Sequence, residues 1–199
     1  AKDLLFEPGD GWEYSNAGYA LLAAIIEVVS QSPVQDYIRH NLLQPLELNS
    51  TGWFGESPGD LTFAKGYRGR RMTGSPPEWM LTWALIGGGG MFSTSTDLFT
   101  WQRAVFESQF FNAESKQLMR KAAYTRWTAG WDSRATDAGL NVIEKGGSGN
   151  YGFTSLLRLY LGSGHVLILV FNSYHDEAEN ETHYFISKQI ENILFAEEY

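Results

Sequence analysis

Residues 6–22 read FEPGDGWEYSNAGYALL, and this stretch decides how the rest of the chain is interpreted. Its first half is rich in the turn residues Gly, Pro and Asp, which break regular structure. After Tyr14, Ser15 and Asn16, apolar residues recur at helical spacing, at Leu21, Leu22, Ile25, Ile26 and Val29. The pattern predicts an irregular segment followed directly by a buried helix.

Three further helices are predicted by their capping signals. Residues 32–35 (SPVQ) fit a capping box with Ser32 as N-cap and Pro at the first helical position, so this helix should run to about Leu43. Residues 94–97 (TSTD) fit another capping box and should begin a helix that reaches residue 106. Asn112 is expected to cap a helix over residues 113–122.

The stretch between these helices, residues 49–80, is interrupted by Gly and Pro too often for a long element. We expect an irregular excursion over the surface there.

The last third of the chain changes from helical to strand-like patterns. Residues 153–161 and 165–173 are rich in β-branched, aromatic and Leu residues around a Gly-Ser-Gly turn, which predicts a β-hairpin. With residues 141–145 this gives three antiparallel strands, followed by a terminal helix over 179–196. The order of elements predicts an α+β fold. One domain should span residues 1–199, with a mostly helical lobe over 1–140 and the strands and terminal helix over 141–199.

The composition excludes several classes of function. The chain contains no cysteine, so disulfides, thiolate zinc sites and a cysteine nucleophile are excluded. The net charge of −8 argues against a nucleic-acid partner. No apolar run approaches the ~18 residues that a membrane span needs, so no span is predicted.

Four segments carry a resemblance to one family. Residues 6–22 resemble the segment that holds the Tyr-x-Asn motif of class C β-lactamases and related esterases and peptidases. Residues 45–51 (PLELNST) resemble Pro-Leu-Gly-Met-x-x-Thr, and residues 88–98 (GGGMFSTSTDL) resemble Gly-Gly-x-x-Ser-Thr-x-x-Asp-Leu. Residues 145–147 (KGG) resemble the strand motif Lys-Thr-Gly or His-x-Gly. The chain is thus similar over nearly its whole length to the serine β-lactamase and penicillin-binding protein superfamily.

The resemblance implies a β-lactamase/transpeptidase-like fold that is only partial. The family's nucleophile motif, Ser-x-x-Lys, precedes Tyr-x-Asn, yet no serine in this sequence has a lysine three positions later. Residues 62–65 (TFAK) have the spacing but follow the Tyr-Ser-Asn segment and lie in the excursion. We therefore expect a fragment that begins mid-domain, without the family's N-terminal strands and with the nucleophile upstream.

The resemblance also implies roles for the two polar residues of the first motif and for the lysine. Tyr14 would act as general base or proton relay, and Lys145 would be a cationic neighbour that also docks a substrate carboxylate. Asn16 would orient the missing lysine and the substrate amide. The alternatives are structural: Tyr14 as a half-buried tyrosine at a helix start, and Asn16 in a turn or capping the helix.

The residues after Lys145 are the remaining site candidates. Gly146 and Gly147 would leave room for a substrate beside the strand, and the backbone N–H of Ser148 would form half of an oxyanion hole. Alternatively, these residues are a Gly-rich turn at a strand end. Gly146 stands where the family usually has Thr or Ser, which weakens the expectation of efficient β-lactam binding.

Three other groups of residues have both a functional and a structural interpretation. The glycine run 87–90 is followed by no Gly-Lys-Ser/Thr, so it predicts close packing of the backbone and no phosphate loop. Trp79 and Trp83 could line a cleft or pack in the core. A metal site could be assembled from four residues near the terminal helix, but a solvated acidic patch is the preferred interpretation; they are His175, Asp176, Glu177 and His183.

The predicted function is that of a serine hydrolase that cleaves amide or ester bonds through an acyl-enzyme, with no cofactor and no metal. The alternative is a non-catalytic homologue that serves as a binding or scaffolding module. The substrate would be a small-molecule or peptide acyl compound, and the resemblance implies a periplasmic or exported location. Because the missing strands would leave a sheet edge unpaired, the fragment should self-associate or bind its own N-terminal segment.

Overall fold

The structure, a computed structural model, describes residues 3–57, 59–149, 151–174 and 182–195. Its helical elements are α1 (Asn16–Ser30), α2 (Val34–Ile38), the π-helical turn η1 (Arg39–Leu43), the 3₁₀ turn η2 (Pro76–Glu78), α3 (Trp83–Gly88), α4 (Ser95–Phe106), α5 (Ala113–Arg120) and α6 (Thr182–Leu194). Its strands are β1 (Gly52–Trp53), β2 (Gly66–Arg68), β3 (Arg71–Gly74), β4 (Met91–Phe92), β5 (Asp132–Ala135), β6 (Asn141–Gly149), β7 (Phe153–Tyr160), β8 (Val166–Phe171) and β9 (Ser173–Tyr174).

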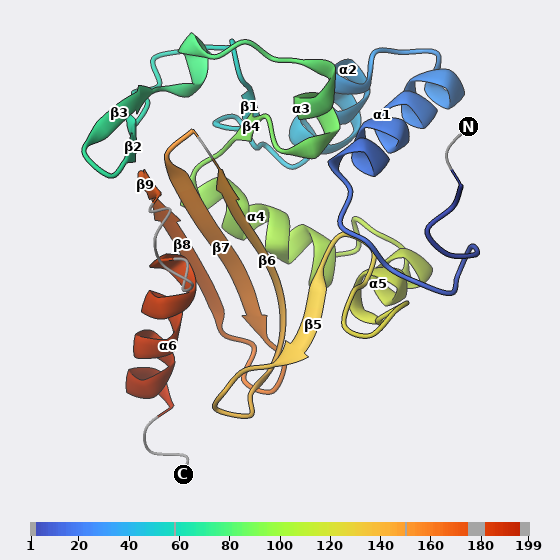
Figure 1. Cartoon of the computed structure of the whole chain (residues 1–199), viewed down its shortest axis with the longest axis vertical. Helices are drawn as coiled ribbons and strands as arrows, with labels where there is room; N and C mark the ends of the chain where they lie inside the picture. The colour runs from blue at the N-terminus through green and yellow to red at the C-terminus, as the bar shows by residue number, and fades with distance from the viewer. Residues whose placement is uncertain (1–2, 58, 150, 175–181, 196–199) are drawn as a thin grey trace.

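The centre of the molecule is an antiparallel sheet with the strand order β5-β6-β7-β8 (Figure 1). The predicted hairpin is present as β7 and β8, and the predicted strand at 141–145 is present as the longer β6. The sequence analysis missed β5, which pairs with β6 from Asp132 to Ala135. Helices α1 to α3 gather beyond one end of the sheet, and α4 and α6 pack on it. The α+β prediction is confirmed.

The two faces of β6 look at different parts of the molecule, because successive side chains in a strand alternate. Ile143 is fully buried in a core cluster with Val105 and Phe106 of α4. Val142, its neighbour, is buried in a different cluster with Phe195, which follows α6. Odd-numbered residues of β6 therefore face the helical lobe, and even-numbered ones face α6.

A network of buried charges lies on the α6 face. The guanidinium of Arg158 in β7 pairs with Glu144, with an Nε–Oε2 distance of 2.6 Å, and also with Glu191 of α6. Tyr160 donates a hydrogen bond to Glu191 (2.9 Å), and Arg134 pairs with Glu144 (2.7 Å). Arg158, Glu144 and Glu191 are each at most 4% exposed. Such pairing is required for charges so deeply buried.

Helix α1 forms where it was predicted, but the prediction that it is buried is wrong. Its apolar face is open: Leu21, Leu22, Ile25 and Val29 are each more than half exposed, and only Ala23 is buried. Within the ranges that the structure describes, α1 packs through its other side against α3. Gly87 makes this approach possible, because a Cβ there would lie 2.5 Å from the carbonyl oxygen of Tyr19.

The second helix has the predicted extent but a different cap. It runs from Val34 to Leu43, with its second half in π-helical geometry. Ser32 does not cap it; instead the carboxylate of Glu27, in α1, accepts from the Val34 backbone N–H at 2.9 Å. A residue from the preceding helix has replaced the local capping box, which a local pattern could not indicate.

The capping predictions for α4 and α5 are confirmed. The Thr94 side chain accepts from the Asp97 backbone N–H, and the Asn112 side chain accepts from the Ser115 N–H. Asp97 is also buried and accepts from the Ser50 N–H (2.9 Å) and the Thr51 hydroxyl (2.7 Å). Two of the segments that carried the family resemblance, 45–51 and 88–98, thus contact each other, and their polar residues hold the fold together.

The excursion over residues 49–80 is more regular than predicted. β2 and β3 form an antiparallel hairpin, and β2 also pairs in parallel with β9. The hairpin contacts the turn between β6 and β7, where Thr73 donates to the Tyr151 carbonyl at 2.5 Å. Gly66 fits beneath that turn, since a Cβ there would lie 2.2 Å from the same carbonyl oxygen. Short strands among glycines give a weak sequence pattern, which explains why they were missed.

One further property concerns membranes. Among the described residues, no single helix has both the length and the apolarity to cross a bilayer. α1 taken together with the α2–η1 helix meets the criteria of length and composition, but the pair bends by 79° at the break between them.

Candidate active site

The first candidate residues lie at the start of α1. The hydroxyl of Tyr14 donates a hydrogen bond to the Asn16 side-chain oxygen at 3.0 Å, and Tyr14 is 65% exposed. Ser15 is the N-cap, and its side chain accepts from the Gly18 backbone N–H at 3.0 Å. The alternative in which Asn16 caps the helix is therefore wrong. Asn16 is the first helical residue, and its side chain is free from capping to hold the Tyr14 hydroxyl.

Lys145 reaches this helix from the sheet. It lies on the odd-numbered face of β6, and its Nζ atom is 5.9 Å from the ring centroid of Tyr19. Tyr19 lies one turn into α1, so the lysine is brought to the end of the helix where Tyr14 and Asn16 are found. The side chain still reaches solvent, but partial burial lowers the pKa of Lys145, and the carboxylate of Asp132 opposes this shift.

The two glycines that follow Lys145 lie on opposite faces of β6. A Cβ at Gly146 would lie 2.8 Å from the Tyr184 hydroxyl and 3.3 Å from the His183 ring, both in α6. The space on the Cβ side of Gly146 is therefore filled by α6, and the idea that this residue leaves room for a substrate stays a prediction. Gly147 is exposed, with Ser155 Oγ at 3.1 Å from its would-be Cβ. Ser148 is exposed in β6 opposite Thr154.

Asp132 and Arg126 also belong to this region, and the sequence analysis missed both. Asp132 begins β5 opposite Glu144, and its Oδ2 atom is 3.2 Å from Arg126 Nε. Burial raises the pKa of Asp132, while the positive charge of Arg126 lowers it. No motif marks these residues, and only the pairing of β5 with β6 brings Asp132 next to the strand that carries Lys145.

Comparison with known proteins places this arrangement in a family. A family model described as Beta-lactamase matches residues 1–189. The chain belongs to the beta-lactamase family. It is 27% identical to penicillin-binding protein 4* of Bacillus subtilis (strain 168), over 98% of this chain and 46% of that relative. The expected β-lactamase/transpeptidase-like fold and superfamily are thereby confirmed.

Solved structures show the same fold. A D-stereospecific amidohydrolase from Streptomyces sp. matches with a TM-score of 0.68 and 26% identity, over 94% of this chain and 56% of that one. The D-amino acid amidase from Ochrobactrum anthropi SV3, in complex with D-phenylalanine, matches with a TM-score of 0.76 and 24% identity, over 97% and 60%. This beta-lactamase family chain thus spans about half the length of these relatives.

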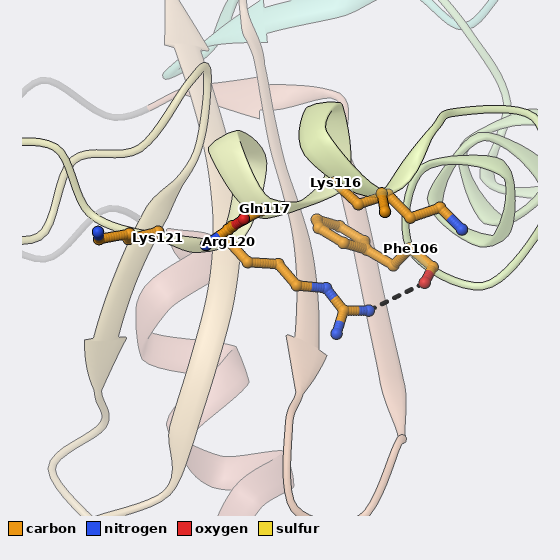
Figure 2. Close-up of a pocket in the computed structure, with 6 residues that line it drawn as sticks. Phe106, Lys116, Gln117, Arg120 and Lys121 are labelled. Carbon is orange, nitrogen blue, oxygen red and sulfur yellow. Dashed lines mark hydrogen bonds between the residues drawn. The ribbon is translucent and has the colours of Figure 1, made fainter.

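A surface cavity of about 360 Å³ in this family member is lined by the end of α4 and by α5 (Figure 2), and none of the predicted site residues is in its lining. Arg120 donates to the Phe106 carbonyl at 2.9 Å, and Lys116 donates to the Ser108 carbonyl. Both cations thus satisfy carbonyl groups at the end of α4, where positive charge is stabilising. The two cations that line this cavity therefore have a structural role as helix caps.

The remaining clusters are accounted for by packing. The glycine run packs the backbone of α3 against α1, as predicted. Trp79 belongs to an aromatic cluster with Phe54, Tyr151 and Phe153, whereas Trp83 begins α3 and is half exposed. Residues 175–177 of the weighed metal site lie outside the described residues. Within the described ranges, no group of three or more His, Asp or Glu side chains could hold a metal ion.

Proposed function

We propose that residues 1–199 form part of a serine hydrolase that cleaves amide or ester bonds through an acyl-enzyme. The observation that carries this proposal is the position of Lys145, a partly buried cation placed 5.9 Å from the α1 side chain Tyr19, at the end where Tyr14 and Asn16 begin the helix. A tyrosine base needs nearby positive charge, because an isolated phenol is almost entirely protonated at neutral pH. The substrate would be a small-molecule or peptide acyl compound.

The proposed roles follow from the faces of the site. Tyr14 is the general base or proton relay, held by Asn16. Lys145 is its cationic neighbour and docks a substrate carboxylate. Gly147 leaves the exposed face of β6 open for the substrate, and the Ser148 N–H supplies one oxyanion donor; losing such a donor typically costs ~3 kcal/mol of transition-state stabilisation. The nucleophilic serine belongs to a segment outside residues 1–199.

The test is intact mass spectrometry after exposure to a reactive β-lactam and, separately, to a fluorophosphonate. We expect no adduct on the 199-residue chain and one adduct on a longer protein that includes an upstream Ser-x-x-Lys. In that longer protein, Tyr14→Phe and Lys145→Ala should each slow acylation by ~100-fold or more. An adduct on the 199-residue chain would place the nucleophile within it, and no adduct on either would support the non-catalytic homologue.

The partner of this chain is proposed to be the segment that carries the nucleophile. Two surfaces suit it: the exposed apolar face of α1, and the edge of β8, which is the last strand of the sheet in the described part of the chain and whose six residues VLILVF are all apolar and none fully buried. An apolar edge strand attracts another chain. The location of the whole protein is proposed to be periplasmic or exported.

This assembly can be tested with two variants of equal chemistry. Ile25→Gln changes the exposed face of α1, and Leu118→Gln changes an equally exposed leucine on α5. Each should alter the free energy of unfolding by no more than ~0.5 kcal/mol. In light scattering of the 199-residue chain, Ile25→Gln should reduce self-association, or binding of the added upstream segment, while Leu118→Gln should not. Equal behaviour of the two variants would remove α1 from the interface.

A further inference from the structure

Two tryptophans far apart in the sequence stack on each other beside the candidate site. Trp12 precedes Tyr14 by two residues, and Trp127 lies in the loop between α5 and β5. Their ring centroids are 4.4 Å apart and their planes differ by 4°. Trp12 remains 40% exposed, so the contact joins two loops at the surface. The segment that carries Tyr14 is thereby attached to the loop that leads into the central sheet.

Arg126 connects this stack to the sheet. Its Cζ atom lies 4.7 Å from the centroid of the Trp127 ring, and its Nε atom lies 3.2 Å from Asp132 Oδ2. A guanidinium can stack on an aromatic ring and pair with a carboxylate at the same time, which the compact ammonium of lysine does less well. The Asp132 side chain is 10% exposed, and its second oxygen, Oδ1, is buried without a hydrogen-bond partner among the described residues.

Asp132 in turn acts on Lys145. The charged groups that bear on Asp132 are Arg126 from the loop, Arg134 on its own strand, and Glu144 and Lys145 on β6. The carboxylate raises the pKa of Lys145, against the larger effect of burial. Lys145 also approaches the uncharged ring of Tyr19, with its Nζ atom 5.9 Å from the ring centroid.

We propose that Arg126 and Asp132 are positioning residues that fix the Tyr14 segment relative to Lys145, through the contacts Trp12–Trp127, Trp127–Arg126 and Arg126–Asp132. The inference rests on the proposed function for its catalytic consequence. The contacts themselves do not depend on the proposed function. Arg126 holds both loops in register, and Asp132, which pairs opposite Glu144, places a negative charge beside the strand that carries Lys145.

The first experiment needs no activity. The Trp12–Trp127 stack should give an exciton signal in circular dichroism that Trp127→Leu abolishes and Arg126→Ala weakens. The Lys145 titration, followed by NMR of the ¹³C-methylated lysine and assigned with Lys145→Arg, should move to lower pH in Asp132→Asn. Arg103→Ala is the control, since Arg103 forms an exposed pair with Glu107 on α4. It should change neither signal.

The second experiment uses the protein that includes the nucleophile. Arg126→Ala should lower kcat/KM by ~10-fold or more through misplacement of Tyr14, and Arg126→Lys should restore part of it. In Asp132→Asn, the basic limb of the kcat/KM pH profile should move to lower pH, because Lys145 then loses its proton earlier. Because the Arg126 side chain is half exposed, its variants are expected to fold.

The outcomes separate the two proposals. Changes in the exciton signal and the Lys145 titration, in a protein that forms no acyl-enzyme, would support the positioning inference and overturn the proposed function. An active protein whose exciton signal, Lys145 titration and pH profile are unchanged in both variants would overturn the positioning inference alone.

Discussion

The two faces of β6 carry adjacent charged residues with opposite circumstances. Glu144, on the α6 face, is 1% exposed and paired with two arginines. Lys145, on the other face, reaches solvent, lies 5.9 Å from the Tyr19 ring centroid and is acted on electrostatically by the Asp132 carboxylate. Removing one partner from a buried, paired charge is strongly destabilising, whereas a charge like that of Lys145, which has no salt bridge among the described residues, is available for a substrate. The comparison teaches that surroundings, more than residue type, separate a structural charge from a candidate catalytic one.

The strongest way to break the comparison is Arg158→Ala, which removes the centre of the structural network. Two buried carboxylates, Glu144 and Glu191, would lose their shared partner, so the free energy of unfolding should fall by ~3–5 kcal/mol. Urea unfolding followed by circular dichroism measures this. Arg103→Ala, which breaks an exposed pair, should cost at most ~0.5 kcal/mol. If both variants lost the same small amount, the α6 face would not depend on its charges.

Gly146 and Gly147, which follow Lys145 in β6, allow a second comparison with smaller expected effects. Gly146→Ala should destabilise the chain by ~1–3 kcal/mol, because the new Cβ would meet Tyr184 and His183 of α6. Gly147→Ala should cost less, since it meets only the Ser155 hydroxyl, but it should slow acylation in the protein that includes the nucleophile. Thermal unfolding of both variants gives the first comparison. A larger stability loss for Gly147→Ala would reverse the assignment of the faces.

The effect that is smallest at neutral pH lies on the α6 face and depends on pH. Burial raises the pKa of Tyr160 to about 12. Since the folded state favours the protonated phenol, this contribution to stability is present below pH ~10 and is lost as pH rises towards 12. The stability advantage of the wild type over Tyr160→Phe, ~1 kcal/mol at neutral pH, should shrink by up to ~1.4 kcal/mol per pH unit in that window. Urea unfolding at several alkaline pH values measures it, and a constant difference between the two proteins would contradict it.

Local signals in the sequence predicted most elements but not what surrounds them. Thr94 and Asn112 cap the helices that their patterns indicate, because an N-cap is made within four residues. The prediction that α1 is buried was wrong, because periodicity marks an apolar face without saying which segment covers it. Ser32 failed as a cap because Glu27 reaches across from another helix.

The residues of the candidate site also divide into those that local motifs predicted and those that they did not. The motif segments located Tyr14, Asn16 and Lys145, and the structure brings Lys145 to the helix that the first two begin. The packing of α6 beside Gly146 was not predicted, because the sequence does not say on which side of β6 this helix lies. Arg126 and Asp132 were missed because strand pairing and ring stacking, which act between distant segments, give them their neighbours.

The pairing of β2 with β9 has a consequence for how the chain acquires its shape. The Asn172 side chain donates to the Lys65 carbonyl across 107 positions of sequence, and parallel strand pairing accompanies this contact. Closing so long a loop costs conformational entropy before the contacts between its ends can compensate for that cost. On the ribosome, the β2–β3 hairpin must wait until residues 173–174 have emerged before it finds its partner. Assembly of this corner is therefore expected late, after the helices and the β7–β8 hairpin have formed from local contacts.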